Sequence, residues 1–281
     1  MTDPRRFAPV LAILLAIVLA ACGQTAPSQA GLTDPTEIVT KASEAAALAK
    51  SVHVDATLDG SIVADLGSIV SVGPPLPSLA PSAPSAAASA RPVPLSGTSA
   101  SADIDLISRT AKGSFSVPTI FNLRGDFIQS GTTTYLKSSL TGDRYMAIRG
   151  ATAAVPVDPV NVPGLIAGLR SILGRDGISP AKAPDVQCGS ADCYQVLIPI
   201  SNAQLRALAG GELPSGLPVD LGSASLALTL RVQKADLRPA GLRVKADLGP
   251  SGLLDADLTL SHWDEAVSVS EPPASEVQPI G

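Results

Sequence analysis

The sequence has few of the residues from which metal centres are built. Its 281 residues include three cysteines and two histidines, too few for a multi-ligand zinc or iron–sulfur site. Charged residues make up 16% of the chain, and 20 Lys and Arg against 25 Asp and Glu give a formal net charge of −5. This mild acidity gives no electrostatic reason to expect a nucleic-acid partner, which would favour a basic face. The composition therefore excludes most metalloenzymes.

Aromatic residues are also scarce. They make up 3% of the chain, although hydrophobic residues reach 45%. A core must then be built from Leu, Val, Ile and Ala rather than from rings. The chain has 24 glycines and 25 prolines, so turns and loops are plentiful and a mostly helical protein is disfavoured. A β-rich protein of the secreted type fits this composition.

Recognisable catalytic motifs are missing. We find no Gly-x-Ser-x-Gly elbow, no phosphate-binding Gly-x-x-x-x-Gly-Lys and no His-Glu-x-x-His. His53 and His262 are far apart in the sequence, and neither has a patterned Asp and nucleophile partner, so we interpret both as solvated surface histidines. The pairs Asp103/Asp105 and Asp255/Asp257 could serve a calcium or carbohydrate site, but carboxylates spaced by two on a wet strand face are usually solubilising. We predict no enzyme, no metal and no cofactor.

The N-terminus carries an export signal. Arg5 and Arg6 precede an almost wholly apolar run over residues 7–20, the pattern of a signal peptide. The run of about 14 residues is shorter than the roughly 20 that a permanent membrane-spanning helix needs. One interpretation is a plain secretory signal with an incidental cysteine. The other rests on the sequence Leu-Ala-Ala-Cys at residues 19–22, which resembles the bacterial lipobox.

The lipobox resemblance implies a lipid anchor. It implies a signal peptide over residues 1–21, cleavage before Cys22, and acyl chains such as palmitate attached to that cysteine. Two or three chains anchor a protein stably, since each buried methylene contributes about 0.8 kcal/mol. The small polar residues after Cys22 form a tether, so residues 22–32 are anchor and tether. We therefore expect the protein on the extracytoplasmic side of a cell membrane.

Two further cysteines, Cys188 and Cys193, close a short segment that contains the turn formers Gly, Ser and Asp. In an exported protein this arrangement favours a disulfide. A redox-active pair remains the alternative, although it more often has two intervening residues rather than four.

Helical signals occur at three places. Asp34 is a plausible N-cap, followed by Pro35 and Glu37, and an apolar stripe continues towards Lys50. Residues 163–173 place Leu and Ile on one face, and residues 202–208 form a shorter candidate.

Period-2 alternation of apolar and polar residues dominates the rest of the chain. It is clearest over residues 52–58, 102–106, 225–232, 242–248 and 254–260. This pattern is typical of antiparallel strands with one buried and one wet face, and a meander is the simplest topology.

The residues from Gly73 to Ser96 interrupt this pattern. They include prolines at positions 74, 75, 77, 81, 84, 92 and 94. We predict a disordered Pro/Ala/Ser insertion at 73–96 in a loop of one domain that spans 33–270, because prolines cannot complete a sheet ladder. Residues 271–281 are predicted to be a loose tail.

Three stretches resemble a known family. The segments AKSVHVDATLDGSI, VPVDPVNVPGLIAGL and LTLSHWDEAVSVSEPP, together with the lipobox, resemble the mycobacterial lipid-carrying lipoproteins of the LppX/LprA/LprF/LprG group. The resemblance implies an α+β fold: a curved antiparallel half-barrel, packed against a few helices and enclosing an apolar cavity.

Two functions follow as hypotheses. The first is an envelope lipoprotein that carries acyl chains of a lipid or glycolipid in this cavity, with an envelope transporter as a further possible partner. The second is a structural or accessory lipoprotein with a closed core and no ligand. The inward positions that we expect to line a cavity are Val54, Leu58, Ile104, Leu106, Leu165, Leu169, Leu228, Leu230, Val244 and Ala246.

Overall fold

A computed structural model describes much of the chain, namely residues 31–64, 91–119, 122–149, 161–173, 175, 177–208 and 223–278. The chain divides into two compact units, residues 1–33 and 34–281, and the fold is that of the second unit. The predicted signal peptide and Cys22 lie outside the described residues.

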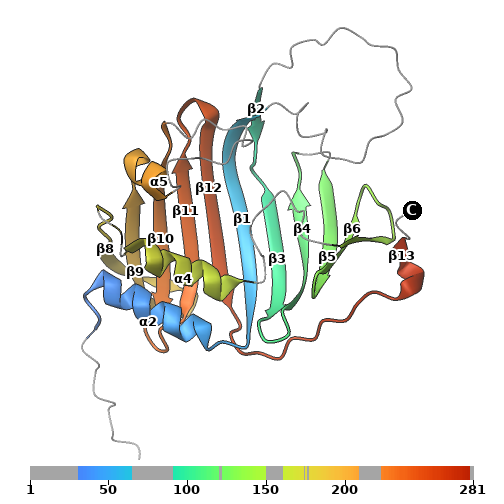
Figure 1. Ribbon diagram of the computed structural model, residues 1–281, viewed down its shortest axis with the longest axis horizontal. Coiled ribbons are helices and arrows are strands. Elements are labelled where there is room, and N and C mark those ends of the chain that lie inside the picture. Colours follow the sequence, from blue (N-terminus) through green and yellow to red (C-terminus); the bar gives the residue numbers. More distant parts are fainter. Residues whose placement is uncertain are drawn as a thin grey trace, which may run out of the picture. The chain divides into compact units, whose positions relative to one another are not determined.

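One curved, almost entirely antiparallel sheet organises this unit (Figure 1). Within the described residues it has 13 strands in the order β13-β7-β6-β5-β4-β3-β1-β12-β11-β10-β9-β8, with β2 paired to β1. The strands of the first run are β1 (Ser51–Ala64), β2 (Arg91–Pro94), β3 (Thr98–Asp105), β4 (Thr110–Val117), β5 (Leu123–Ser130), β6 (Thr133–Ser138) and β7 (Tyr145–Arg149). Those of the second run are β8 (Ala181–Cys188), β9 (Ala191–Ile200), β10 (Ser225–Gln233), β11 (Pro239–Asp247) and β12 (Gly252–Ser261), and β13 (Val277–Gln278) follows.

Each run is a meander, as the alternation predicts. What joins them is the long antiparallel pairing of β1 with β12, which runs from His53 opposite Ser261 to Ile62 opposite Gly252. β7 and β8, although consecutive in the chain, therefore lie at opposite sides of the sheet. The α+β class and the curved half-barrel expected from the sequence are confirmed.

The first helix forms where its capping residues predict it. α2 (Pro35–Ala47) begins after Asp34, whose side chain accepts a hydrogen bond from the backbone N–H of Thr36 at 2.9 Å. Its buried face includes Ile38, Val39 and Ala42, and it packs on β9, β10 and β11. The small residues of this stripe let the helix lie close to the sheet.

The two other predicted helices are also present. α4 (Val162–Leu173) packs on α2 and buries Val162, Ile166 and Leu169. α5 (Asn202–Leu208) contacts β10. Its Leu205 packs against a small cluster formed by Ala224, Ala246 and Leu248.

Part of the predicted disordered insertion is ordered, so that prediction is wrong for its last residues. Arg91–Pro94 forms β2, which pairs with β1 from Ser61 opposite Pro94 to Ala64 opposite Arg91. Prolines are tolerated here because β2 pairs on only one side in the described residues, where a missing N–H is harmless. Residues 73–90 lie outside the described residues.

The predicted loose tail is likewise partly ordered. Val277 and Gln278 form β13, which pairs with β7 in parallel, and Ser130 donates a hydrogen bond from Oγ to Glu271 Oε1 at 2.9 Å. A strand edge carries unpaired backbone groups, and the returning chain satisfies those of β7.

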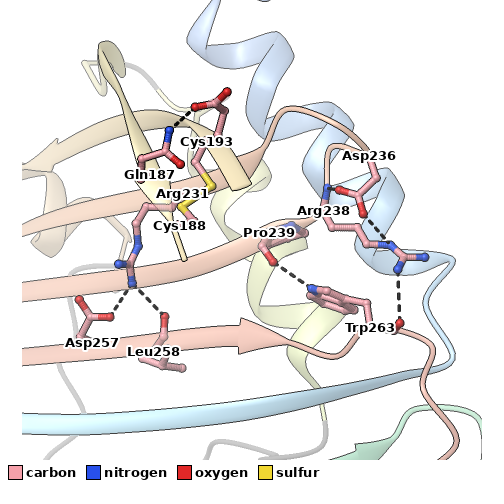
Figure 2. Close-up of a disulfide and its surroundings, with 11 residues drawn as sticks. Gln187, Cys188, Cys193, Arg231, Asp236, Arg238, Pro239, Asp257, Leu258 and Trp263 are labelled. Atoms are coloured by element: carbon pink, nitrogen blue, oxygen red, sulfur yellow. Dashed lines mark hydrogen bonds and ion pairs between the residues drawn. A yellow bond between two sulfur atoms is a disulfide. The ribbon is translucent and has the colours of Figure 1, made fainter. Parts of the chain in front are cut away.

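Trp263, just after β12, is buried and donates from Nε1 to the Pro239 carbonyl at 3.1 Å (Figure 2).

Cys188 and Cys193 are bridged, as predicted, with their Cα atoms 6.0 Å apart. The bond spans the hairpin of β8 and β9, whose turn contains Gly189 with φ +62° (Figure 2). β8 itself was not predicted from the sequence. It contains Pro184, and its pairing register shifts between Ala183 and Val186, which breaks the period-2 pattern.

Replacing both Cys188 and Cys193 by alanine should lower the free energy of unfolding by about 2 kcal/mol, because the bridge closes only a short loop in the unfolded chain. Urea denaturation of the two proteins without reductant measures this difference. Ser190→Ala, in the same turn, is the control and should leave stability unchanged. A double variant as stable as the wild type would contradict a stabilising role for the bridge.

Candidate functional site

Strand register defines two faces of the sheet. Directly paired residues share a face, so the sheet can be followed across its strands from Leu230 through Leu242, Leu258, Ala56 and Ala100 to Phe115. On the part of the sheet that α2 covers, this face is the buried one, whereas the opposite face exposes Leu197 at 40%. We call the face that bears Leu230 and Ala100 the inner face.

The inner face is fully packed on its helix-covered part. There the side chains of β9, β10 and β11 form a dense aliphatic core with exposures below 9%, namely Val196, Ile198, Ile200, Leu228, Leu230, Val232, Ala240, Leu242 and Ala246. Burial of this kind stabilises by roughly 25 cal/mol per Å² of apolar surface. This part of the inner face is therefore a structural core.

On β12, β1 and β3 to β7 a few inner-face side chains are buried, among them Val52, Ile104, Ala111 and Leu260, whereas a longer series of apolar side chains is only half-buried. We call these side chains the inner strip: Val54, Ala56, Leu58, Ala100, Ala102, Phe115, Phe127, Leu136, Met146, Leu254, Ala256 and Leu258. They come from seven neighbouring strands, β12 to β7. With about 4.8 Å between strands, the strip extends roughly 30 Å across the curved sheet.

The two phenylalanines of the inner strip lie over glycines of neighbouring strands. A Cβ added at Gly125 would lie 2.8 Å from the Phe115 ring, and one added at Gly113 would lie 2.8 Å from the Phe127 ring. Each ring covers a directly paired glycine, an arrangement known to support glycines in sheets. Because the rings lie along the sheet, they fill little of the space above it.

The predicted cavity residues fall into three groups. Val54, Leu58 and Val244 are half-buried on the inner face. Ile104, Leu228, Leu230, Ala246 and Leu169 are packed, with exposures from 0% to 7%. Leu106 lies in the β3–β4 turn, and Leu165 on α4 is 41% exposed.

The best-formed depressions of the described residues do not coincide with these candidates. Their volumes run from about 270 to 730 Å³, and of the ten predicted candidates only Ala246 lines one of them. The largest lies where β9 to β12 and β1 end, and most of its lining side chains, such as Pro199, Lys245 and Leu253, belong to the outer face. The described residues thus present the inner strip as an open apolar surface.

Cross-strand ion pairs cover the outer face. Arg243 donates to both carboxylate oxygens of Asp255 at 2.8 and 2.6 Å, which lowers the pKa of that carboxyl. Arg231 extends across β11 and donates to Asp257 Oδ1 at 2.6 Å (Figure 2). The glycine at position 241 leaves room for it, because the Cβ of any other residue there would lie 2.4 Å from the guanidinium. Asp255 and Asp257 are therefore engaged by arginines and do not form a calcium or carbohydrate site.

His53 is not the solvated histidine that we predicted. Its Nδ1 lies 2.7 Å from Asp103 Oδ1, and its Nε2 lies 3.3 Å from both Asp55 Oδ2 and Ser101 Oγ. Its ring also meets that of His262 at a centroid distance of 5.5 Å. The period-2 pattern put His53 and Asp103 on wet faces, but it could not show that β1 and β3 are neighbours with these residues directly opposite.

The surroundings of His53 favour its charged form. The hydrogen bond to Asp103 raises its pKa above 6.5, and the nearby Asp55 raises it further, against the effect of burial. Ser101, His53 and Asp103 are arranged like the serine, histidine and aspartate of a hydrolase triad. A histidine that acts as the general base, however, needs a free lone pair on Nε2. With Asp55 beside Nε2, the imidazolium is stabilised instead, so the cluster acts as an ion-paired clamp between β1 and β3.

His53→Gln should therefore cost more stability at acidic than at alkaline pH. The folded-state pKa lies above the unfolded value of 6.5, so the contribution is fully present below about pH 6.5 and is lost as the pH rises through the folded-state pKa. Melting temperatures of wild type and variant at pH 5.5 and 8.5 measure it. A difference that grew with pH would contradict the charged pair. His262→Gln is the control for loss of an imidazole nearby.

Neither a cluster of metal-binding side chains nor a membrane-spanning helix occurs among the described residues. No three side chains of His, Cys, Asp or Glu among them are grouped closely enough to hold a metal ion. None of the helices that the structure describes has the length and apolar character to cross a membrane.

The fold resembles that of solved lipoprotein structures. LprF from Mycobacterium bovis superposes with a TM-score of 0.52 at 19% identity, covering 86% of this chain and 99% of LprF. Mycobacterium tuberculosis lipoprotein LppX gives a TM-score of 0.47 at 16% identity, covering 84% of this chain and 98% of LppX. No protein-family model matches the chain, and no curated protein does. The LprF comparison confirms, at the level of the fold, the resemblance seen in the sequence.

Proposed function

We propose that this protein is a cell-envelope lipoprotein that is anchored through acyl chains on Cys22 and carries lipid or glycolipid acyl chains on its inner strip. The observation that supports the proposal is the strip itself: aliphatic side chains of seven neighbouring strands, left half-buried beside a fully packed core. Contiguous exposed apolar surface of this extent is uncommon on soluble proteins and usually marks a binding site.

The dimensions of the inner strip suit acyl chains. One leaflet of a bilayer has a hydrocarbon thickness of about 15 Å, half of the whole core, and the strip extends roughly 30 Å across the sheet. The alanines at positions 56, 100 and 102 project only a methyl group from the sheet, so an acyl chain can lie along this surface. Each methylene removed from water contributes about 0.8 kcal/mol.

The polar groups fit a carrier rather than an enzyme. On β12, β1 and β3 to β6 the charged side chains lie on the outer face by register, where arginines pair with Asp255 and Asp257 and the ring of His53 pairs with Asp103. The inner strip has no such group, and an apolar site with few polar groups is suited to binding acyl chains. A lipid anchor would hold the strip next to its ligands, on the extracytoplasmic side of the membrane, where an envelope transporter could deliver them.

Lipid extraction followed by mass spectrometry tests the proposal directly. Protein purified from its own host without detergent should release a stoichiometric lipid on denaturation, and the emptied protein should bind a fluorescent acyl probe. A protein that releases no lipid and binds no acyl probe would instead be a structural or accessory lipoprotein, and the proposal would fail.

A further inference from the structure

Two polar side chains lie next to each other at one end of the inner face. Gln129 is the last inner-face residue of β5, Thr134 is the first of β6, and the two are directly paired. The Cβ atoms of such a pair are about 5 Å apart, so one group of a ligand can contact both side chains. The other inner-face residues of β5, by alternation, are Leu123, Gly125 and Phe127, and none of them is polar.

The row of paired residues that contains Gln129 and Thr134 opens from β3 towards β7. On one side of Gln129 are Ile104 and Ala111, with exposures of 2% and 1%. On the other side Thr134 is half-buried and Ile148 is 43% exposed. Gln129 is itself half-buried. The two polar side chains thus lie where the packed part of this row meets its open part, and a ligand on the inner face can reach them.

Neither side chain has a hydrogen-bond partner among the described residues. A carboxamide or hydroxyl that is partly withdrawn from water costs free energy unless it is hydrogen-bonded. Ser138, on the same face of β6, shows the usual solution, because its Oγ lies 3.3 Å from Thr141 Oγ1. The carboxamide of Gln129 and the hydroxyl of Thr134 are therefore available to a polar group of a ligand.

The charged residues near this pair do not share its face. Lys112 and Ser130 alternate with the inner-face residues of β4 and β5, and on that outer side the Glu271 carboxylate accepts from Ser130 Oγ at 2.9 Å. Arg149 is in the register row of Ser130, and Arg109 of the β3–β4 turn already has a partner. On β4 to β7 no inner-face position of the described residues is charged. The pair therefore offers no countercharge to a phosphate.

We propose that Gln129 and Thr134 bind the uncharged, hydroxyl-bearing headgroup of the carried lipid, a sugar or a glycerol. A carboxamide and a hydroxyl each donate and accept hydrogen bonds, as do the hydroxyls of such a headgroup. The proposal rests on the carrier function above and adds where the headgroup lies. Phe127, Leu136 and Met146 of the inner strip form the adjoining row, so the acyl chains can continue from the headgroup onto the strip.

Competition against a fluorescent acyl probe tests this site. The emptied full-length protein is titrated with an alkyl glucoside, a monoacylglycerol and an alkyl phosphate of equal chain length, each below its micelle-forming concentration. Gln129→Leu and Thr134→Val remove the hydrogen-bonding groups with little change in volume. Gln195→Leu and Thr229→Val are the matched controls, because both residues are half-buried on the outer face of β9 and β10.

Gln129→Leu and Thr134→Val should each weaken the binding of a neutral probe roughly 5-fold for each hydrogen bond lost. Binding of the alkyl phosphate should stay unchanged, which also shows that the variants remain folded, and the controls should match the wild type. Loss with the glucoside alone identifies a sugar, and loss with the monoacylglycerol alone identifies glycerol.

Unchanged binding of both neutral probes, or an equal loss with all three probes, overturns the headgroup site and leaves the carrier function in place. A wild-type protein that binds none of the probes and releases no lipid removes the carrier function, and the headgroup site with it.

Discussion

Ala100→Trp is expected to remove most of the bound lipid while the protein remains folded. Ala100 lies in the middle of the inner strip, directly paired with Ala56 on one side and Phe115 on the other. It is only half-buried, so an indole can be accommodated above the sheet without displacing the core. The ring would then occupy the surface along which an acyl chain lies. Mass spectrometry of extracted lipid, normalised to protein, measures the loss.

The control for this variant is the next residue. Ser99→Trp adds the same ring on the outer face of the same strand, where Ser99 is exposed, and it should keep the lipid content of the wild type. If both variants lose lipid alike, the loss results from a disturbance of β3 and not from blocking the inner face. The inner strip is then not the binding site.

Ala246→Trp distinguishes the strip from the packed core. Ala246 is on the inner face but is 5% exposed, in a cluster against which Leu205 of α5 packs. Inserting a ring into such a core typically costs 1–3 kcal/mol or more by overpacking, and an indole adds far more volume than a methylene. We expect this variant to be strongly destabilised. An Ala246→Trp protein as stable as the wild type would show that this part of the inner face is not closed.

Cys22→Ala is expected to move the protein almost completely from the membrane fraction to the soluble fraction, or to leave its signal uncleaved. The reason is that the lipobox resemblance puts all acyl chains on this residue, and each lost methylene removes about 0.8 kcal/mol of membrane affinity. Detergent partitioning and intact mass measure the change.

The other two cysteines supply the control for the anchor. The double alanine variant at positions 188 and 193 removes the disulfide but should still partition with the membrane. If the Cys22→Ala protein keeps normal detergent partitioning, and its mass differs only by the substitution, the anchor hypothesis is wrong.

Local signals in the sequence were sufficient for the helices and most strands. Asp34 and Pro35 begin α2 because capping and proline geometry act within one turn. Alternation over residues 225–232 and 242–248 identified β10 and β11 and the face that each one buries. The predictions failed where pairing partners decide the outcome: β2 and β13 form although prolines are in or beside them, because strand edges of β1 and β7 are available to them.

The candidate site was predictable only in part. Alternation gave Val54, Leu58 and Leu230 the same face, and the register confirms this. It could not distinguish Leu230, at 0% exposure, from half-buried Val54 and Leu58, because side-chain period says which face a residue is on and not whether another element covers that face.

The sequence by itself therefore determined the faces of the strands that it predicted and the helix starts, and it favoured the Cys188–Cys193 bridge, since each depends on neighbours within a few residues. Only the tertiary structure decided that α2 covers β9 to β11, that β1 joins β12 to close the two meanders into one sheet, and that Lys50 meets Leu106. These pairings bring together segments far apart in the chain, and many registers satisfy the same alternation. The choice among them is made by the total apolar surface buried and by the backbone hydrogen bonds completed in the whole fold.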